Sequence, residues 1–214
     1  MKNKILLIIL FSVITVGCTF WGVRGNGKIK TETRLIENFK RIDVSGSFTV
    51  KIQVGEQTSL KIKGEENLLP LIKTQVRGNT LILDTKKSLS PRKELLILVT
   101  TPELEGMDCA GANDILVEGI KTNSFEIDLS GACSIELNGI AEKFIADLSG
   151  AGSINAKNLE ASKVYISVSG AASANVFARE FLDASVSGVG SIDFFGNPNK
   201  TNTNVSGVGS INRK

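Results

Sequence analysis

The chain has 214 residues, of which 42% are apolar, and it contains 21 Gly, 4 Pro, 3 Cys and no His. This length suits a single domain, and abundant Gly with little Pro favours tight turns and repetition over disorder. The formal charge of +3 gives no support for nucleic-acid binding. The lack of His removes the commonest general base and excludes Ser-His and Cys-His nucleophile pairs.

Residues 1–17 have the three-part pattern of an export signal. Lys2 and Lys4 supply a basic start, and a predominantly apolar run of 12 residues extends from Ile5 to Val16. Such a run is too short to span a bilayer, which needs about 20 apolar residues. We therefore expect this segment to be removed rather than to anchor the protein.

The residues Thr15-Val16-Gly17-Cys18 resemble the lipobox of bacterial lipoproteins, although Thr15 stands where Leu is usual. The resemblance implies that Cys18 becomes the first residue of the mature protein and carries diacylglycerol. Several acyl chains on one residue give durable anchoring, because each buried CH₂ contributes about 0.8 kcal/mol. Residues 18–35 are then predicted to be a polar tether. The alternative is an ordinary signal peptide with a coincidental Cys.

Residues 36–104 show strand patterns with irregular spacing. Alternating apolar residues surround Gly46, namely Ile42, Val44, Phe48, Val50 and Ile52. Further strand-like runs cover residues 60–63, 80–83 and 95–100, with a short helix or loop over 65–72 and a turn at 77–79. We interpret this part as the basal, irregular end of one solenoid. A separate small domain is the alternative.

Residues 105–214 contain an internal repeat, which is the strongest signal in the chain. Its mark is a Gly within a small-residue motif such as Ser-Gly-Ala-Gly-Ser. The repeated positions are Gly111, Gly131, Gly150, Gly170, Gly188 and Gly207, with spacings of 20, 19, 20, 18 and 19 residues. The sequence therefore predicts coils of about 19 residues, each with a Gly at a corner where a Cβ would not fit.

Two sets of alternating apolar residues flank each repeated Gly, as expected for two strands per coil. Those before the Gly include Phe125-Ile127-Leu129 and Phe144-Ala146-Leu148, and those after it include Ile135-Leu137 and Ile154-Ala156. Stacked coils bury such side chains, each large one contributing about 1.5 to 3 kcal/mol. In the last coil the polar residues Thr201, Thr203 and Arg213 suit a terminal cap. The predicted fold class is an all-β parallel β-helix.

Cys109 and Cys133 belong to a chain that is predicted to be exported, a setting in which disulfides are common. The repeat puts them in neighbouring coils but four positions out of line, which is about 13 Å along a strand at ~3.3 Å per residue. A bridge needs Cα atoms within about 7 Å of each other. We therefore expect no disulfide and interpret both as small buried residues.

Several segments resemble the family described as putative auto-transporter adhesin, head GIN domain. They are Phe39 to Ile52, Glu66 to Pro70, Val76 to Leu83 and the Ser-Gly-Ala-Gly-Ser coils. The resemblance covers about residues 36–212. It implies a right-handed single-stranded β-helix in cell-envelope proteins, commonly lipoproteins of Bacteroidetes, and it supplies no catalytic residues.

The outward positions offer few candidates for a functional site. Asp108, Asp128 and Asp147 fall on one row at a spacing of about 4.8 Å, where they could bind Ca²⁺ or form the carboxylate pair of a polysaccharide lyase. A solvated row is the favoured interpretation, because no basic ladder accompanies it and the calcium-binding glycine repeat is absent. Tyr165 is the only outward aromatic ring that we place in the coils, so no lectin-like platform is predicted.

The two parts of the mature chain differ in charge. Residues 18–104 hold 15 basic and 9 acidic residues, whereas residues 105–214 hold 8 and 13. A basic half close to a membrane could contact anionic headgroups. We favour the simpler interpretation, in which scattered Lys residues keep exposed strand edges soluble.

Together these features predict a non-enzymatic cell-envelope lipoprotein, anchored through Cys18, whose single solenoid domain spans residues 36–214 and is adhesin-like or binds a partner. No catalytic residue, metal, cofactor or nucleic-acid partner is predicted, and the outer membrane is the expected location. A protein or glycan partner would use the polar ladders or an open strand edge. The alternatives are a purely structural envelope protein and a polysaccharide-active β-helix enzyme.

Overall fold

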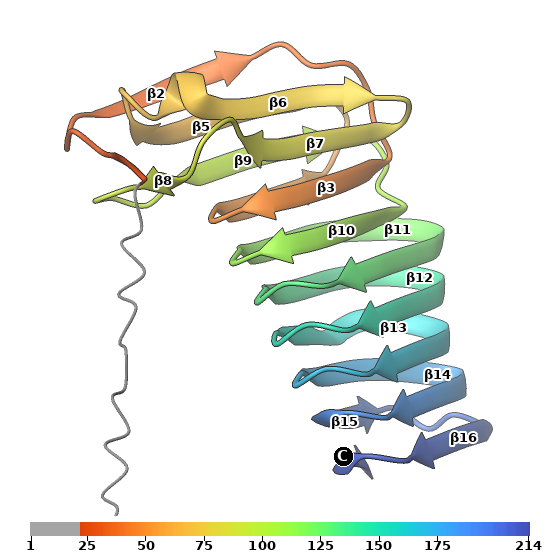
Figure 1. Cartoon of the computed structure of the whole chain (residues 1–214). Helices are drawn as coiled ribbons and strands as arrows, with labels where there is room; N and C mark the ends of the chain where they lie inside the picture. The colour runs from red at the N-terminus through yellow and green to blue at the C-terminus, as the bar shows by residue number, and fades with distance from the viewer. Residues whose placement is uncertain (1–21) are drawn as a thin grey trace, which may run out of the picture.

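The computed structural model describes residues 22–214, which form a β-solenoid of about five turns (Figure 1). Within this range the only helical element is one short 3₁₀ helix, η1 (Leu69–Leu71). The all-β solenoid predicted from the glycine repeat is confirmed. The predicted export signal and Cys18 lie outside the described residues.

The regular coils stack from residue 106 toward the C-terminus. Their strands are β10 (Gly106–Gly111), β11 (Asp114–Leu129), β12 (Ser134–Leu148), β13 (Ser153–Val168), β14 (Ser173–Val186), β15 (Val189–Phe195), β16 (Lys200–Val205) and β17 (Val208–Arg213). Strands β11 to β14 have 14 to 16 residues each, because each continues around one corner of its coil.

The basal part has shorter strands and a less regular path. They are β1 (Val23–Arg24), β2 (Ile29–Arg34), β3 (Arg41–Gly46), β4 (Thr49–Val54), β5 (Ser59–Glu65), β6 (Ile72–Arg77), β7 (Thr80–Thr85), β8 (Leu89–Ser90) and β9 (Leu96–Thr101). The short helix η1 falls inside the 65–72 stretch that the sequence assigns to a helix or loop.

Two walls enclose the core. One runs from β6 through β7, β3 and β10 into the second halves of β11 to β14 and ends at β16. The other runs from β2 through β5, β9 and β4 into the first halves of β11 to β14 and ends at β15 and β17. Within the regular coils all strand pairs are parallel, whereas β2–β5, β5–β9 and β6–β7 are antiparallel.

The core lies between the walls and contains the predicted inward rows. Ile127, Ile135 and Ile154 are at most 1% exposed, and the Phe125 and Phe144 rings of adjacent coils stack with their centroids 6.4 Å apart. In the last coil Thr201 and Thr203 are exposed, as expected for a terminal cap. The period-two assignment of inward and outward residues is therefore confirmed in the coils.

The repeated Gly residues form a column at one corner, where each coil rests on the one before. A Cβ added to Gly150 would lie under 3.0 Å from the Gly131 carbonyl oxygen, and Gly131 meets Gly111 in the same way. Backbone hydrogen bonds cross this corner, with the Ala151 N–H donating to the Gly131 carbonyl at 3.0 Å. The corner leaves no room for a side chain at this position.

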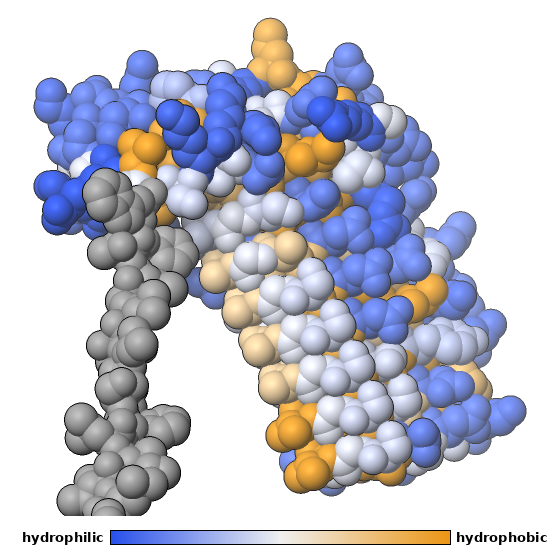
Figure 2. Space-filling model, viewed as in Figure 1, coloured by the Kyte–Doolittle hydropathy of each residue, from blue (hydrophilic) through white to orange (hydrophobic). Residues whose placement is uncertain are grey.

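Figure 2 shows this corner as a continuous pale column that becomes more hydrophobic toward the C-terminal coils. In those coils the residue after the Gly is Val, and Val189 and Val208 are 63% and 77% exposed. The earlier coils carry Ala at this position.

The predicted tether of residues 18–35 is too long, because the chain is already folded from Val23 onward. Strand β1 pairs with β8, and β2 pairs antiparallel with β5. The alternation of Ile29, Thr31 and Thr33 with charged residues carries this strand signal.

Buried Glu65 fastens this first segment to the basal part. Its carboxylate accepts hydrogen bonds from the backbone N–H groups of Gly27, Arg92 and Lys93. Burial raises the pKa of the Glu65 carboxyl, but these three donors and the charge of Arg92 together lower it by more, and the net pKa lies below its usual value. The ionised carboxylate thus joins β5 to two segments that are distant in sequence.

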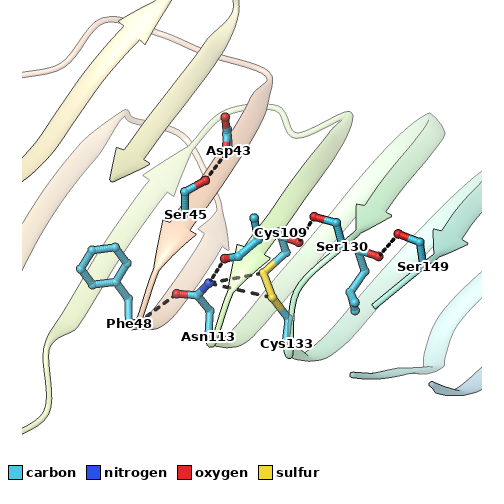
Figure 3. The surroundings of a disulfide bond; sticks show 10 residues. Asp43, Ser45, Phe48, Cys109, Asn113, Ser130, Cys133 and Ser149 are labelled. Atoms are coloured by element: carbon cyan, nitrogen blue, oxygen red, sulfur yellow. Dashed lines mark hydrogen bonds between the residues drawn. A yellow bond between two sulfur atoms is a disulfide. The ribbon is translucent and has the colours of Figure 1, made fainter. Parts of the chain in front are cut away.

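The prediction that Cys109 and Cys133 remain unpaired is wrong, because they form a disulfide with a Cα–Cα distance of 6.6 Å (Figure 3). Cys109 aligns with Leu129 in the next coil, and the chain then turns at the Gly131 corner. Counting four positions along a straight strand ignores this turn. Residues just before and just after the corner face the same part of the core, so the two Cys side chains meet.

Asn113 fills the space beside the disulfide and is itself buried. Its side-chain oxygen accepts a hydrogen bond from the Phe48 N–H at 2.9 Å, and its Nδ2 donates to the Ala110 carbonyl at 2.6 Å (Figure 3). The Asn113 amide therefore joins the segment just before basal strand β4 to the first regular coil, while the disulfide joins the first two regular coils to each other.

The disulfide should stabilise the full chain. Closing a loop of this size, in which the two cysteines are 24 positions apart in sequence, is worth about 3 kcal/mol in the chain-entropy model. We expect Cys109→Ala/Cys133→Ala to lower the midpoint of thermal unfolding, measured by circular dichroism, about as much as reduction lowers that of the native chain. The reductant should have no effect on the double variant. A native chain whose unfolding is insensitive to reductant would contradict the bond.

Candidate functional site: the aspartate face

The solenoid presents two flat lateral faces. The aspartate face consists of the outward residues of β3, β10, the second halves of β11 to β14, and β16. The serine face consists of the outward residues of β4, the first halves of β11 to β14, β15 and β17. It is marked by a row of Ser residues in register, which are Ser134, Ser153, Ser173, Ser191 and Ser210. The aspartate face carries more varied chemistry and is the better candidate.

The predicted row of Asp108, Asp128 and Asp147 exists, and it is longer than the sequence analysis found. These residues are direct neighbours on successive strands, and Asp43 of β3 precedes Asp108 in the same row. The row continues without charge through Ser167, Ser185 and Asn204. Four carboxylates therefore lie side by side at the strand spacing of about 4.8 Å.

One arginine lies beside the acidic row. The Arg41 guanidinium donates a hydrogen bond to the Glu126 carboxylate at 2.8 Å, and its other terminal nitrogen lies 3.5 Å from the Asp108 carboxylate. Gly106 stands between Arg41 and Glu126 in the strand register. A Cβ at Gly106 would lie 2.8 Å from the guanidinium, so this Gly allows the side chain to cross the intervening strand.

The stacking of carboxylates changes their acidity. Partial burial raises the pKa of Asp108, and the charges of Asp128 and Asp43 add to this, while Arg41 opposes it. Partial burial also raises the pKa of Asp147, with further contributions from Asp128 and Glu126. For both groups the largest cause of the raised pKa is partial burial, and the crowding of like charges adds to it. Asp128 is the neighbour that both shifted groups face.

The acidic row does not form a chelating cluster. Between residues 22 and 214, no group of three or more Asp, Glu, Cys or His side chains converges in a way that could hold a metal ion. The carboxylates point outward in parallel from a flat sheet, whereas a cation site needs ligands that converge on one point.

A cluster of aromatic and basic side chains lies farther along the same face. Tyr165 of β13 and Phe181 of β14 have ring centroids 5.4 Å apart. The Lys143 ammonium lies 5.0 Å from the centroid of the Tyr165 ring, and the Lys200 ammonium lies 5.8 Å from that of Phe181. Lys163 pairs directly with both Lys143 and Phe181 in the strand register.

The prediction that Tyr165 is the only outward aromatic ring in the coils is therefore wrong. Phe181 lies seven positions before Gly188, the same offset that places Lys143, Lys163 and Lys200 outward in their coils. The signal was thus present in the repeat. The alignment of outward positions covered the Asp row but not the row at this offset, so Phe181 was not found. Counting back from Gly46 in the same way places Arg41 and Asp43 at outward positions of this face.

The comparisons with known proteins agree with this architecture. Residues 38–198 match the model of the family described as putative auto-transporter adhesin, head GIN domain. The match covers most of the chain, and the protein therefore belongs to this family, whose name indicates a cell-envelope or surface protein. No protein of curated function matches the chain.

The chain is also similar to several solved structures. A putative adhesin from Bacteroides fragilis NCTC 9343 is 29% identical, with a TM-score of 0.76, over 90% of this chain and 100% of its own. Two proteins of Parabacteroides distasonis ATCC 8503 show the fold alone. A putative adhesin is 18% identical with a TM-score of 0.59, over 90% of this chain and 100% of its own. A putative lipid binding protein is 22% identical with a TM-score of 0.55, over 90% and 99%.

Removing the central charge of the acidic row should stabilise the fold at neutral pH. Asp128→Asn relieves repulsion with two neighbours and should add about 0.5 to 1 kcal/mol to the free energy of unfolding. Because the folded-state pKa values of Asp108 and Asp147 are raised, their ionisation costs stability above those values. The gain should shrink as pH falls through them and the native carboxyls take up protons.

Denaturant titrations at several pH values measure this gain. Asp114→Asn is the matched control, because Asp114 pairs with Thr49 and Ser134 rather than with another carboxylate. A Ca²⁺-dependent rise in the stability of the native chain that disappears in Asp128→Asn would contradict the solvated row and favour a metal site.

Proposed function

We propose that this protein is a non-enzymatic, adhesin-like module of the cell envelope that is held on a lipid tether and binds its partner through the aspartate face. Membership of the adhesin family supports the general class. The binding role and the lipid tether are our own inference.

The observation that carries the proposal is the form of the aspartate face. Outward residues stay in register over successive parallel strands from β3 to β16, so their side chains make rows along the solenoid axis. Such a surface can contact an extended partner at many points. A flat array of parallel side chains favours recognition over chemistry, because catalysis needs groups that converge on one reacting atom.

The polysaccharide-active enzyme is the weaker alternative. Its best support is Arg41 beside Asp108 and Glu126, since a lyase needs a base next to carboxylates. The guanidinium is engaged by both acids, and a guanidinium has N–H donors but no acceptor, so it cannot serve as the base. This arrangement is better suited to holding neighbouring coils together.

The lipid tether rests on the sequence before Gly22. Within the described part of the chain, no helix is long and apolar enough to cross a membrane. The lipobox-like segment ending in Cys18 would supply the anchor, and strand β1 begins five residues later at Val23. The solenoid would then lie close to the bilayer, with its basic basal part nearest the anchor.

The binding role can be tested by blocking each face in turn. Ser167→Arg/Ser185→Arg places bulky cations on the aspartate face, and Ser173→Arg/Ser191→Arg places the same groups on the serine face of the same coils. Cells displaying the full chain should adhere to immobilised polysaccharide and matrix-protein layers. We expect the first pair to reduce adhesion several-fold and the second to leave it unchanged. Equal adhesion by both variants, with native thermal stability, would refute the assigned face.

The anchor can be tested independently. Cys18→Ser should move the full-length protein from the membrane fraction to the soluble envelope fraction, because acyl chains supply about 0.8 kcal/mol of membrane affinity per buried CH₂. Immunoblots of fractions after a high-salt wash measure the distribution, and Thr19→Ser serves as a matched control. Persistent membrane association of Cys18→Ser would show that the anchor lies elsewhere.

A further inference from the structure

The aromatic and basic cluster on the aspartate face is the feature that carries an inference about the ligand. We call it the aromatic–lysine patch and define it by Tyr165, Phe181, Lys143, Lys163 and Lys200. The inference deepens the proposed function and rests on it, because it names the ligand class for the same face.

The patch is arranged along the solenoid axis. Lys143, Lys163, Phe181 and Lys200 form one row across the four strands β12, β13, β14 and β16. At about 4.8 Å per strand this row spans roughly 14 Å. Tyr165 stands beside it in the next outward row, where its direct neighbour on β14 is Asp183. The two rings and the three ammonium groups therefore face one elongated strip of surface.

The ammonium groups have free capacity to bind an anion. Among the described residues, neither Lys143 nor Lys200 lies within 4.0 Å of a carboxylate, and Lys163 has only a distant contact of 3.9 Å with Glu142. Lys143 and Lys200 instead lie over aromatic rings. A cation–π contact leaves the hydrogen-bond donors of the ammonium largely available, so it positions the charge without neutralising it.

The patch also has groups suited to hydroxyls. The Asp183 carboxylate accepts a hydrogen bond from the Asn202 side-chain amide at 3.5 Å, and both lie next to the rings in the strand register. A carboxylate and an amide together can accept from and donate to sugar hydroxyls. Aromatic rings provide apolar area for the C–H faces of sugar rings.

This combination selects among anionic polymers. A nucleic acid would also use lysines and stacking rings, but the Asp183 carboxylate, which is the direct neighbour of Tyr165 in the strand register, disfavours a densely charged phosphate backbone. An acidic peptide has no hydroxyls along its backbone for the Asp183 carboxylate beside the rings to bind. A polysaccharide with one carboxylate or sulfate per one or two sugars fits better, because its charges are spaced and hydroxyls lie between them.

We propose that the aromatic–lysine patch is a binding site for an acidic polysaccharide, which lies along the solenoid axis with sugar rings against Tyr165 and Phe181 and its anionic groups on the three lysines. The alternative is that Tyr165 and Phe181 are a cross-strand aromatic pair that only stabilises the sheet. The two differ in whether the rings and lysines affect binding in a correctly folded protein.

The test uses the purified full chain in detergent, with polygalacturonate as the acidic probe and dextran as the neutral one. Isothermal titration calorimetry should show that the protein binds polygalacturonate and does not bind dextran. Tyr165→Ala/Phe181→Ala should weaken it about tenfold or more, which corresponds to ~1.4 kcal/mol. Lys143→Gln/Lys163→Gln/Lys200→Gln should weaken it at least as much and reduce its salt dependence.

Matched controls separate the patch from general charge and general stability. Lys51→Gln/Lys61→Gln/Lys63→Gln removes the same charge from exposed positions of β4 and β5 and should leave the affinity within about twofold of native. Phe177→Ala/Phe195→Ala removes an aromatic pair that is in register on β14 and β15 of the other wall, with a lysine, Lys157, 5.8 Å from the Phe195 ring. It should also leave binding unchanged.

Four outcomes would overturn the inference. They are absence of polygalacturonate binding, equal losses from the patch and control triples, native affinity in a folded Tyr165→Ala/Phe181→Ala variant, and equal binding of a single-stranded oligonucleotide. Adhesion of cells displaying the variants then separates the two proposals. If the patch variants adhere normally while Ser167→Arg/Ser185→Arg does not, the face binds its partner but this patch is not the site.

Discussion

The whole structure depends on direct backbone contact between successive coils at the glycine corner. Gly150, Gly170 and Gly188 each lie so close to the carbonyl of the preceding Gly that a Cβ would not fit. This contact brings the corner backbones into hydrogen-bonding distance, and the two flanking walls follow in register. Because the strands on both sides of that corner are in register, the outward side chains on both faces form aligned rows. The acidic row and the aromatic–lysine patch are therefore consequences of the corner as much as of their own residues.

The fold and the inward rows could be predicted because both follow from the Gly motif, which recurs about every 19 residues, and from the alternation of apolar residues on either side of it. Two features depend on geometry beyond that period. The Cys109–Cys133 bond forms across a corner, where distance along the chain says little about distance in space. The pairing of β2 with β5 joins segments about thirty residues apart in an irregular region, where no repeat supplies a register.

The candidate site was partly readable from the sequence. Asp108, Asp128 and Asp147 were placed correctly because they lie at one offset from repeated Gly residues. Phe181 and Arg41 lie at equally regular offsets, and only the choice of rows to align concealed them. No offset could reveal that the Arg41 side chain reaches across Gly106 to Glu126. This contact depends on the length of the arginine side chain and on the absence of a Cβ at Gly106, the residue that it crosses.

The second corner of each coil follows a different rule from the glycine corner. At this corner, where the first half of each long strand meets its second half, the register shifts once between β11 and β12, once between β12 and β13, and twice between β13 and β14. Before and after the corner, the strands pair residue by residue on both walls. Coils of 18, 19 and 20 residues can therefore stack on one another without disturbing the core. Insertions and deletions should be tolerated at this corner and rejected at the other. A solenoid of this design can diversify its surface by changing loop length at one edge, and the same edge offers engineers a place to graft new peptide segments.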